Sequence, residues 1–196
     1  IGFTRLVLII ATFSFVVYLI PGMFGAPLTG LSGIIPAPTK QAFNLSASSP
    51  TAKFDKSSIC EEPKYSDILH LPHGLNGYFD YEQALSCARE QNKPLFIDFV
   101  GHACANCKVM EQKVWSDPRV LERLSQDYIV VALYVDERTK LPESEWFTSE
   151  IDGKVKNTIG KSNADFQISR YNVNSQPFYV LLDKDENLLT NPYGFN

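Results

Sequence analysis

The sequence predicts an α/β domain in which a mixed sheet is flanked by helices. Two continuous apolar runs, 95–100 and 128–135, have the length and composition of strands buried inside a sheet. A helical pattern lies between them, and strand, helix, strand at this spacing makes a right-handed unit with two parallel strands. A third apolar run, 178–182, leads into turn residues and predicts an antiparallel hairpin. A parallel pair joined to a hairpin gives a mixed sheet.

Composition and charge are those of an ordinary globular protein. The 196 residues suffice for one domain with a core plus appendages, and 44% hydrophobic with 20% charged residues argue against disorder of the whole. A net charge of -4 without any Lys or Arg cluster argues against a nucleic-acid partner. Because the chain opens on Ile1 and not on Met, we expect it to be a piece of a longer protein.

Residues 1–24 are predicted to form a transmembrane helix. The stretch 6–20 is almost wholly apolar and, with its neighbours, approaches the roughly 20 residues that cross a bilayer. Arg5 before it and Pro21 after it fit a helix that begins on the cytoplasmic side. The alternatives are a signal peptide and a buried core helix. Both the span and the signal peptide place the rest of the chain outside the cytoplasm.

Residues 25–64 are rich in Pro, Ser, Thr, Ala and Gly, which predicts a linker with little capacity to pack. Cys60 at its end is interpreted as incidental, or as a free or partner-linked thiol. The globular domain is predicted over 65–196. Four cysteines are too few for a fold of this size to depend mainly on disulfides for its stability.

Within the domain, a first helix is predicted over 81–91 with Asp80 as its N-cap. Cys87 lies beside the apolar face of this helix and is expected to be a small, part-buried hydrophobe. After the strand 95–100, a helical pattern runs to Asp117-Pro118, and 119–126 predicts a second helix or a continuation after a kink.

The last third of the chain is predicted to hold an insertion, a helix and the hairpin. The segment 136–161 is polar and irregular, as in a surface insertion, and 164–171 predicts a short helix. Turn residues at 183–187 follow the strand 178–182, and the returning strand is expected to begin at Leu188-Leu189.

Cys104 and Cys107 form a Cys-x-x-Cys pair where a strand passes into a helix. The positive end of the helix dipole lowers the pKa of the first thiol, so Cys104 is the expected nucleophile. Cys107, one turn into the helix, suits the role of resolving thiol. The alternative is zinc, which needs four ligands, and neither a second Cys-x-x-Cys nor a His-x-x-x-His is present. We therefore expect redox chemistry, with no metal and no cofactor.

This order of features resembles the thioredoxin superfamily, and more closely the C-terminal thioredoxin-like domain of DsbD-type thiol:disulfide interchange proteins. The resemblance covers roughly residues 80–189. It lies in Lys-Pro-Leu-Phe-Ile-Asp-Phe at 93–99, Cys-Ala-Asn-Cys-Lys-Val-Met-Glu at 104–111, Val-Trp at 114–115 and Gln-Pro-Phe-Tyr-Val-Leu-Leu-Asp at 176–183. The resemblance implies a thioredoxin-like fold, a redox-active disulfide between Cys104 and Cys107, and a 6–20 segment that is the last membrane helix of such a protein.

The resemblance also gives roles to Asp98 and Pro177. A carboxylate in the apolar run around Asp98 is costly unless it is protonated or paired, and in the family this acid carries protons to and from the second cysteine. The alternative is a strand-end acid turned to solvent. Pro177 matches the family's cis-proline, which shapes the surface for substrate; an ordinary trans proline is the alternative. His102 either helps to hold a thiolate or is a solvated loop histidine.

Two departures from the family stand out. Ala103 replaces the Trp that is common before the cysteine pair, and Ala105-Asn106 replace Gly-Pro between the cysteines. The sequence therefore does not determine the reduction potential of the pair. The family's closing helix after the last hairpin is missing from this sequence, and we expect either a truncated sequence or one bare apolar face of the sheet.

The function expected from these features is reduction of protein disulfides by a thioredoxin-like domain tethered to the bacterial inner membrane and facing the periplasm. Its expected partners are protein disulfide substrates and a preceding membrane domain that supplies electrons. The alternatives are an oxidase or isomerase that uses the same cysteines, and a non-catalytic module that binds a partner around Pro177.

Overall fold

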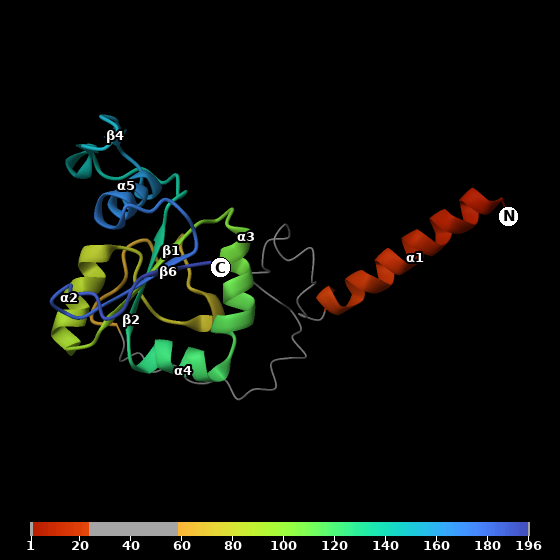
Figure 1. The fold of residues 1–196 in the computed structure, drawn as a ribbon, viewed down its shortest axis with the longest axis horizontal. Coiled ribbons are helices and arrows are strands. Elements are labelled where there is room, and N and C mark those ends of the chain that lie inside the picture. The colour runs from red at the N-terminus through yellow and green to blue at the C-terminus, as the bar shows by residue number, and fades with distance from the viewer. Residues whose placement is uncertain (1, 24–58, 196) are drawn as a thin grey trace. The chain divides into compact units, whose positions relative to one another are not determined.

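The computed structural model describes residues 2–23 and 59–195, which belong to two separate units (Figure 1). The first unit is a helix, and the second is a domain with a sheet. Most of the predicted linker, 25–58, lies outside the described residues.

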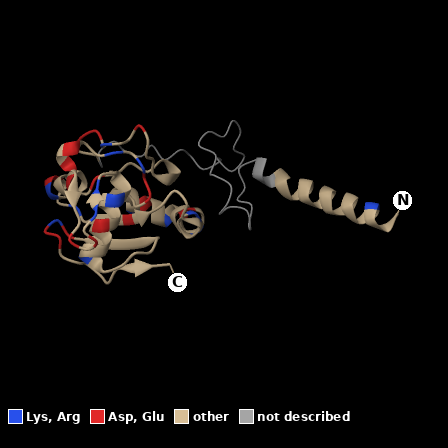
Figure 2. Ribbon diagram, turned by 90° about the horizontal axis from the view of Figure 1, so that it is seen from above, with Lys and Arg blue, Asp and Glu red and all other residues tan. Residues whose placement is uncertain are grey.

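The first unit contains α1 (Phe3–Met23), the apolar helix expected at this end. Arg5 is its single charged residue, and Figure 2 shows the contrast with the domain, which carries both signs of charge. By length and composition, Phe3–Ile20 could cross a membrane, and none of it is buried against other described residues. A membrane span and a signal sequence both fit.

The domain is built on a mixed sheet, as the sequence predicts. Its strands are ordered β2-β1-β5-β6. Their bounds are β1 (Leu95–Val100), β2 (Ile129–Tyr134), β5 (Phe178–Leu182) and β6 (Tyr193–Gly194). β1 is parallel to β2 and antiparallel to β5, so it is hydrogen-bonded on both sides. A parallel bridge between Tyr78 and Val131 continues the sheet beyond β2.

The helices follow the expected order, with one boundary displaced. They are η2 (Pro72–Gly74), α2 (Tyr81–Gln91), α3 (Ala105–Met110), the π-helical turn η3 (Glu111–Trp115), α4 (Pro118–Gln126) and α5 (Ile159–Tyr171). The predicted bounds and N-cap of α2 are confirmed, since Asp80 accepts a hydrogen bond from the Gln83 backbone N–H at 2.9 Å. The prediction that the last helix begins at 164 is wrong, because Thr158 caps it by accepting from Lys161 N–H at 3.3 Å.

Side chains of β1 alternate between two layers. Leu95, Ile97 and Phe99 enter the core shared with α2 and β5. On the other face, Phe96 packs edge-on against Trp115 of η3, with ring centroids 5.7 Å apart, and Val100 clusters with Cys107. This period-two alternation places one face of β1 directly against the helix that carries the cysteine pair.

The predicted insertion is not wholly irregular. It contains the short helix η4 (Glu143–Glu145) and a two-stranded sheet of β3 (Phe147–Thr148) and β4 (Val155–Lys156). The N-terminal turn of α5 falls inside its predicted bounds of 136–161, so the insertion ends at the helix cap.

The returning strand begins later than expected. Leu188 makes one isolated bridge with Leu182, whereas the strand that pairs with β5 is β6, opposite Phe178 and Tyr179. Between these pairings lies Pro192, which has no backbone N–H to donate to a ladder.

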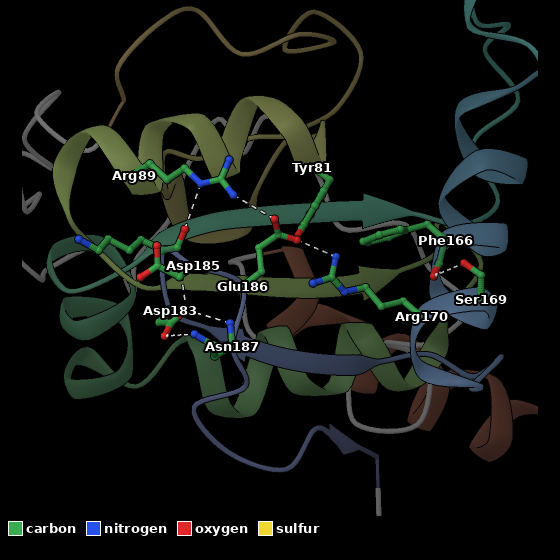
Figure 3. Close-up of polar contacts among 10 residues, drawn as sticks. Tyr81, Arg89, Phe166, Ser169, Arg170, Asp183, Asp185, Glu186 and Asn187 are labelled. Carbon is green, nitrogen blue, oxygen red and sulfur yellow. Dashed lines mark hydrogen bonds and ion pairs between the residues drawn. The ribbon is translucent and has the colours of Figure 1, made fainter.

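Glu186 fastens the hairpin turn to the helices. Its carboxylate accepts hydrogen bonds from the Tyr81 hydroxyl at 2.9 Å, from Arg89 at 3.0 Å and from Arg170 at 2.9 Å (Figure 3). The Arg170 guanidinium also lies over the Tyr81 ring, 5.6 Å from its centroid. One carboxylate therefore joins α2, α5 and the turn after β5.

Cys60 and Cys87 form a disulfide, with Cα atoms 5.6 Å apart, which corrects their interpretation as an incidental thiol and a small hydrophobe. The segment around Cys60 is also hydrogen-bonded to the domain. The Tyr78 hydroxyl accepts from Cys60 N–H at 2.8 Å, and the buried Gln83 side chain bonds the backbones of Glu62 and Lys64, both at 2.9 Å. Residues 59–64 thus pack on α2, and the domain begins before the predicted 65.

Replacing both Cys60 and Cys87 by Ser is expected to lower the free energy of unfolding by about 2–4 kcal/mol. The disulfide closes a loop across 27 residues, and its loss restores conformational freedom to the unfolded chain. Urea denaturation of the full chain in neutral detergent measures the change. A double Ala variant controls for the cost of burying serine hydroxyls. An unchanged unfolding midpoint would contradict a stabilising role.

Candidate redox site

Cys104 and Cys107 form the second disulfide of the described chain, at the start of α3. Cys104 is the N-cap of α3, and its Sγ accepts a hydrogen bond from Cys107 N–H at 3.1 Å. Cys104 is half-buried, whereas Cys107 is 2% exposed. An external sulfur can therefore reach Cys104, and a helix N–H is already directed at its sulfur, which favours a thiolate there.

The site lies where the parallel strands β1 and β2 end. β1 passes into the loop 101–103 before Cys104, and β2 passes into 135–137. Adjacent parallel strands present their C-terminal loops at one edge of a sheet, so these two segments meet. The cysteine pair thus stands on a rigid strand and a helix start.

Asp98 lies in the middle of β1 on the face that packs against α3. It is 4% exposed, and its Oδ1 has no hydrogen-bond partner in the described part of the chain. Burial first, and then the negative charge of Glu111, raise the pKa of Asp98 well above its usual range, while Lys108 opposes the rise. The alternative of a solvent-facing acid is wrong, because the carboxyl is buried.

Glu111 and Lys108 are a charged pair near this carboxyl that sequence reasoning missed. The Lys108 ammonium donates to both Glu111 carboxylate oxygens at 2.9 Å. In the sequence the two residues form an ordinary i, i+3 pair, which is usually a feature of a solvated helix face. The π-helical turn that starts at Glu111 changes the register of the helix at that residue.

The loop before Cys104 is held by Asp136. One carboxylate oxygen accepts His102 N–H at 2.8 Å and the other accepts Ala103 N–H at 3.1 Å. Gly101 gives this carboxylate room, since a Cβ there would lie 3.1 Å from Oδ2. Sequence reasoning missed Asp136, although its position directly after a strand was a usable signal.

The His102 side chain pairs with Glu137, with Nε2 and Oε2 2.7 Å apart, and its ring lies 4.5 Å from the Tyr134 ring. Partial burial raises the pKa of Glu137, but hydrogen bonds from Thr139 and from His102 outweigh it and lower the pKa to about 2. The imidazole therefore fastens the loop to the end of β2.

The Gln176–Pro177 peptide bond is cis, in agreement with the resemblance, and Pro177 is buried. The Gln176 side chain donates to Gln167 Oε1 at 2.8 Å, and Gln167 donates to Ser175 O at 2.9 Å. Gln167 on α5 is fully buried, so it fixes the loop that precedes β5. A polar residue in a helix with both polar and apolar neighbours gave no sequence signal for this role.

A cavity of about 340 Å³ opens beside Cys104. It is lined by Gly101, Ala103, Cys104, Ala105, Asn106, Val135, Asp136 and Gln176. The structure thus brings Cys104 together with Gln176, the residue before Pro177. A molecule in this cavity would lie against both Cys104 and Asp136.

Comparison with known proteins supplies a family model and several solved structures. The model, described as Thioredoxin-like, matches residues 76–184. No curated protein matches the chain. Among solved structures, the DsbH oxidoreductase has 17% identity and a TM-score of 0.47, with 66% of this chain and 81% of that one covered.

Two further structures show a similar likeness. The thioredoxin from Thermus thermophilus has 24% identity and a TM-score of 0.37, with 54% of this chain and 63% of that one covered. A disulphide isomerase from Xylella fastidiosa Temecula1 has 13% identity and a TM-score of 0.40, with 62% and 77% covered.

Replacing Asp98 by Asn is expected to stabilise the oxidised protein as pH rises. Because the pKa of Asp98 is raised in the folded state, the unfolded chain releases this proton first, so wild-type stability falls above a pH of about 4. Asn stays neutral, and the variant should exceed the wild type by about 1–3 kcal/mol at alkaline pH. Urea denaturation at several pH values measures the difference.

The matched control for this experiment is Glu122→Gln on α4, which removes one exposed carboxylate and alters the net charge equally. Wild-type and Asp98→Asn curves that run parallel from pH 4 to pH 8 would show that the buried carboxyl does not titrate as described.

Proposed function

Because the chain belongs to the thioredoxin-like family, we propose that it is a thiol:disulfide oxidoreductase that reduces protein disulfides through Cys104 and Cys107. The observation that carries this proposal is the unequal exposure of two bonded cysteines at the start of α3, on the face of β1 that holds a buried carboxyl. An attacking thiol must be reachable and a resolving thiol must not compete for substrate.

The reaction balances as two thiol exchanges. In the reduced protein, the Cys104 thiolate attacks one sulfur of a substrate disulfide, forms a mixed disulfide and releases the other substrate sulfur as a thiolate. Cys107 then loses its proton and attacks Cys104 Sγ, which forms the Cys104–Cys107 disulfide and releases the second substrate sulfur. Two electrons pass from the protein to the substrate, and the two released substrate thiolates take up the proton lost by Cys107 and one proton from solvent.

Asp98 is the proposed proton carrier for the second step. It lies on the same face of β1 as Val100, and Val100 packs against Cys107. A buried carboxyl with a raised pKa can exchange a proton with a buried thiol without either group meeting bulk water. Pro177, beside the cavity residue Gln176, is proposed to shape the surface that receives the substrate backbone.

The direction of transfer is proposed from the charges around the pair. Asp136 lines the Cys104 cavity, and no Lys or Arg side chain of the described residues forms an ion pair with it. Negative charge near a thiol disfavours the thiolate and so favours the disulfide over the dithiol, which makes the dithiol a better reductant. A strong oxidase has the reverse property, a stabilised reduced form.

The proposed location is the bacterial inner membrane, with the domain in the periplasm and α1 as the anchor. Support comes from the apolar helix and from the Cys60–Cys87 disulfide, whose cysteines belong to a different core cluster from Cys104 and Cys107. Disulfides that do not turn over persist in oxidising compartments. A reduced Cys104–Cys107 pair in such a compartment needs a donor, and a preceding membrane domain is the proposed source.

The Cys107→Ser variant is expected to accumulate a mixed disulfide with a model substrate protein, whereas Cys104→Ser forms none. Without Cys107 the bond from Cys104 to substrate has no resolving thiol, so it should persist. Non-reducing mass spectrometry of the full chain in detergent, after mixing with the disulfide-containing substrate, detects the adduct. The Cys60→Ser, Cys87→Ser double variant serves as the control. Substrate turnover by Cys104→Ser at the wild-type rate would contradict the proposal.

A further inference from the structure

The cavity beside Cys104 has one charged side chain among its eight lining residues, Asp136. The Asp136 side chain is exposed, so a ligand in the cavity can reach it. Its two oxygens accept from His102 and Ala103 N–H at 2.8 and 3.1 Å, which fixes the carboxylate in place. Each carboxylate oxygen has a second lone pair, and these remain available to a donor.

Gln176 adds a second acceptor to the same cavity. Its amide nitrogen donates to Gln167 Oε1 at 2.8 Å, so the amide is held in one orientation. The side-chain carbonyl oxygen of Gln176, Oε1, accepts no hydrogen bond from any residue in 2–23 or 59–195. The lining beside Cys104 therefore combines the charged side chain of Asp136 with the neutral residue Gln176.

The other charges near the site are already paired or buried. Glu137 pairs with His102, and Lys108 pairs with Glu111. Asp98 is buried beneath the helix. In the described part of the chain, no Lys, Arg or His side chain forms an ion pair with Asp136. Asp136 is thus the carboxylate at this site whose charge a substrate can neutralise.

We propose that Asp136 makes the site select protein disulfides in which the attacked cysteine is flanked by Lys or Arg. This inference rests on the proposed function and names its substrate class. In an extended chain the residues next to a cysteine lie within about 4 Å of it along the backbone, so they enter the cavity when that cysteine bonds to Cys104. An ammonium there is attracted to Asp136, and a second carboxylate is repelled.

A purely structural role of Asp136 would behave differently. If the Asp136 carboxylate served only to hold the loop before Cys104, its loss would lower the reduction rate of every substrate by the same factor. Selection by charge instead changes the ratio between cationic and anionic substrates. The ratio is therefore the quantity to measure.

The test uses symmetric peptide dimers, Gly-X-Cys-X-Gly joined by one disulfide, in which X is Lys, Ala or Glu. Symmetry makes both sulfurs of each dimer equivalent. The full chain in neutral detergent is reduced, freed of reductant and mixed with each dimer, and single-turnover rates are recorded. Each rate is divided by the rate of the same dimer with dithiothreitol, which removes intrinsic differences in peptide reactivity.

The normalised rates are expected to fall in the order Lys, Ala, Glu, with roughly a tenfold ratio between Lys and Glu at low salt, because an exposed charge pair shifts a rate by about threefold in each direction. The ratio should shrink as salt is added. Asp136→Asn keeps a carbonyl acceptor for the loop and should bring the ratio close to one. Glu150→Gln, at the exposed turn between β3 and β4, changes net charge equally and should preserve the ratio.

Equal normalised rates for the three dimers in the wild type would overturn the selectivity and leave the oxidoreductase proposal standing. A wild-type ratio that survives in Asp136→Asn would assign selection to the overall charge and overturn the role of Asp136. Failure to reduce any dimer would overturn both proposals. Equal wild-type rates overturn the selectivity even when Asp136→Asn does not fold. In that case Asp136→Ser, which also removes the charge and keeps an oxygen acceptor for the loop, decides the role of Asp136 by the same ratio.

Discussion

The burial of β1 on both faces is the constraint on which the site depends. Because β1 lies between β2 and β5, its backbone is paired on both edges and its register is fixed. Leu95, Ile97 and Phe99 fill one core, so Asp98 must face the cysteine helix. A shift of one residue would exchange the two faces and place the carboxyl in an apolar core, at a cost of several kcal/mol.

Around this strand, loops from different parts of the chain are joined by a few polar side chains. Asp136, at the end of β2, holds the turn that delivers Cys104, and Gln167 of α5 holds the loop before β5 through Gln176. These contacts bring Cys104, the carboxylate of Asp136 and Gln176 to the lining of one cavity. The same side chains that shape the site therefore set its charge.

Sequence reasoning succeeded where the signal is local. The bounds of α2, the strands β1 and β2, and the position of Cys104 and Cys107 all follow from periodicity, capping and spacing. Sequence reasoning failed for features that depend on which distant segments the fold brings into contact. The bond between Cys60 and Cys87 joins segments that no local pattern relates, and the role of Gln167 depends on a loop eight residues away. β6 begins at Tyr193, directly after Pro192, and pairs with the far end of β5 from the hairpin turn.

We infer that the chain holds one redox-active disulfide, Cys104–Cys107, and one structural disulfide, Cys60–Cys87. Equilibration of the full chain in a series of dithiol redox buffers, followed by alkylation and mass spectrometry, measures the oxidation of each pair. We expect Cys104–Cys107 to be reduced as a single two-electron couple, because Cys104 lines an open cavity and a helix N–H favours its thiolate. Cys60–Cys87 should stay oxidised, because both of its cysteines lie in the main core cluster. Reduction of Cys60–Cys87 first, or of both pairs together, would contradict this account.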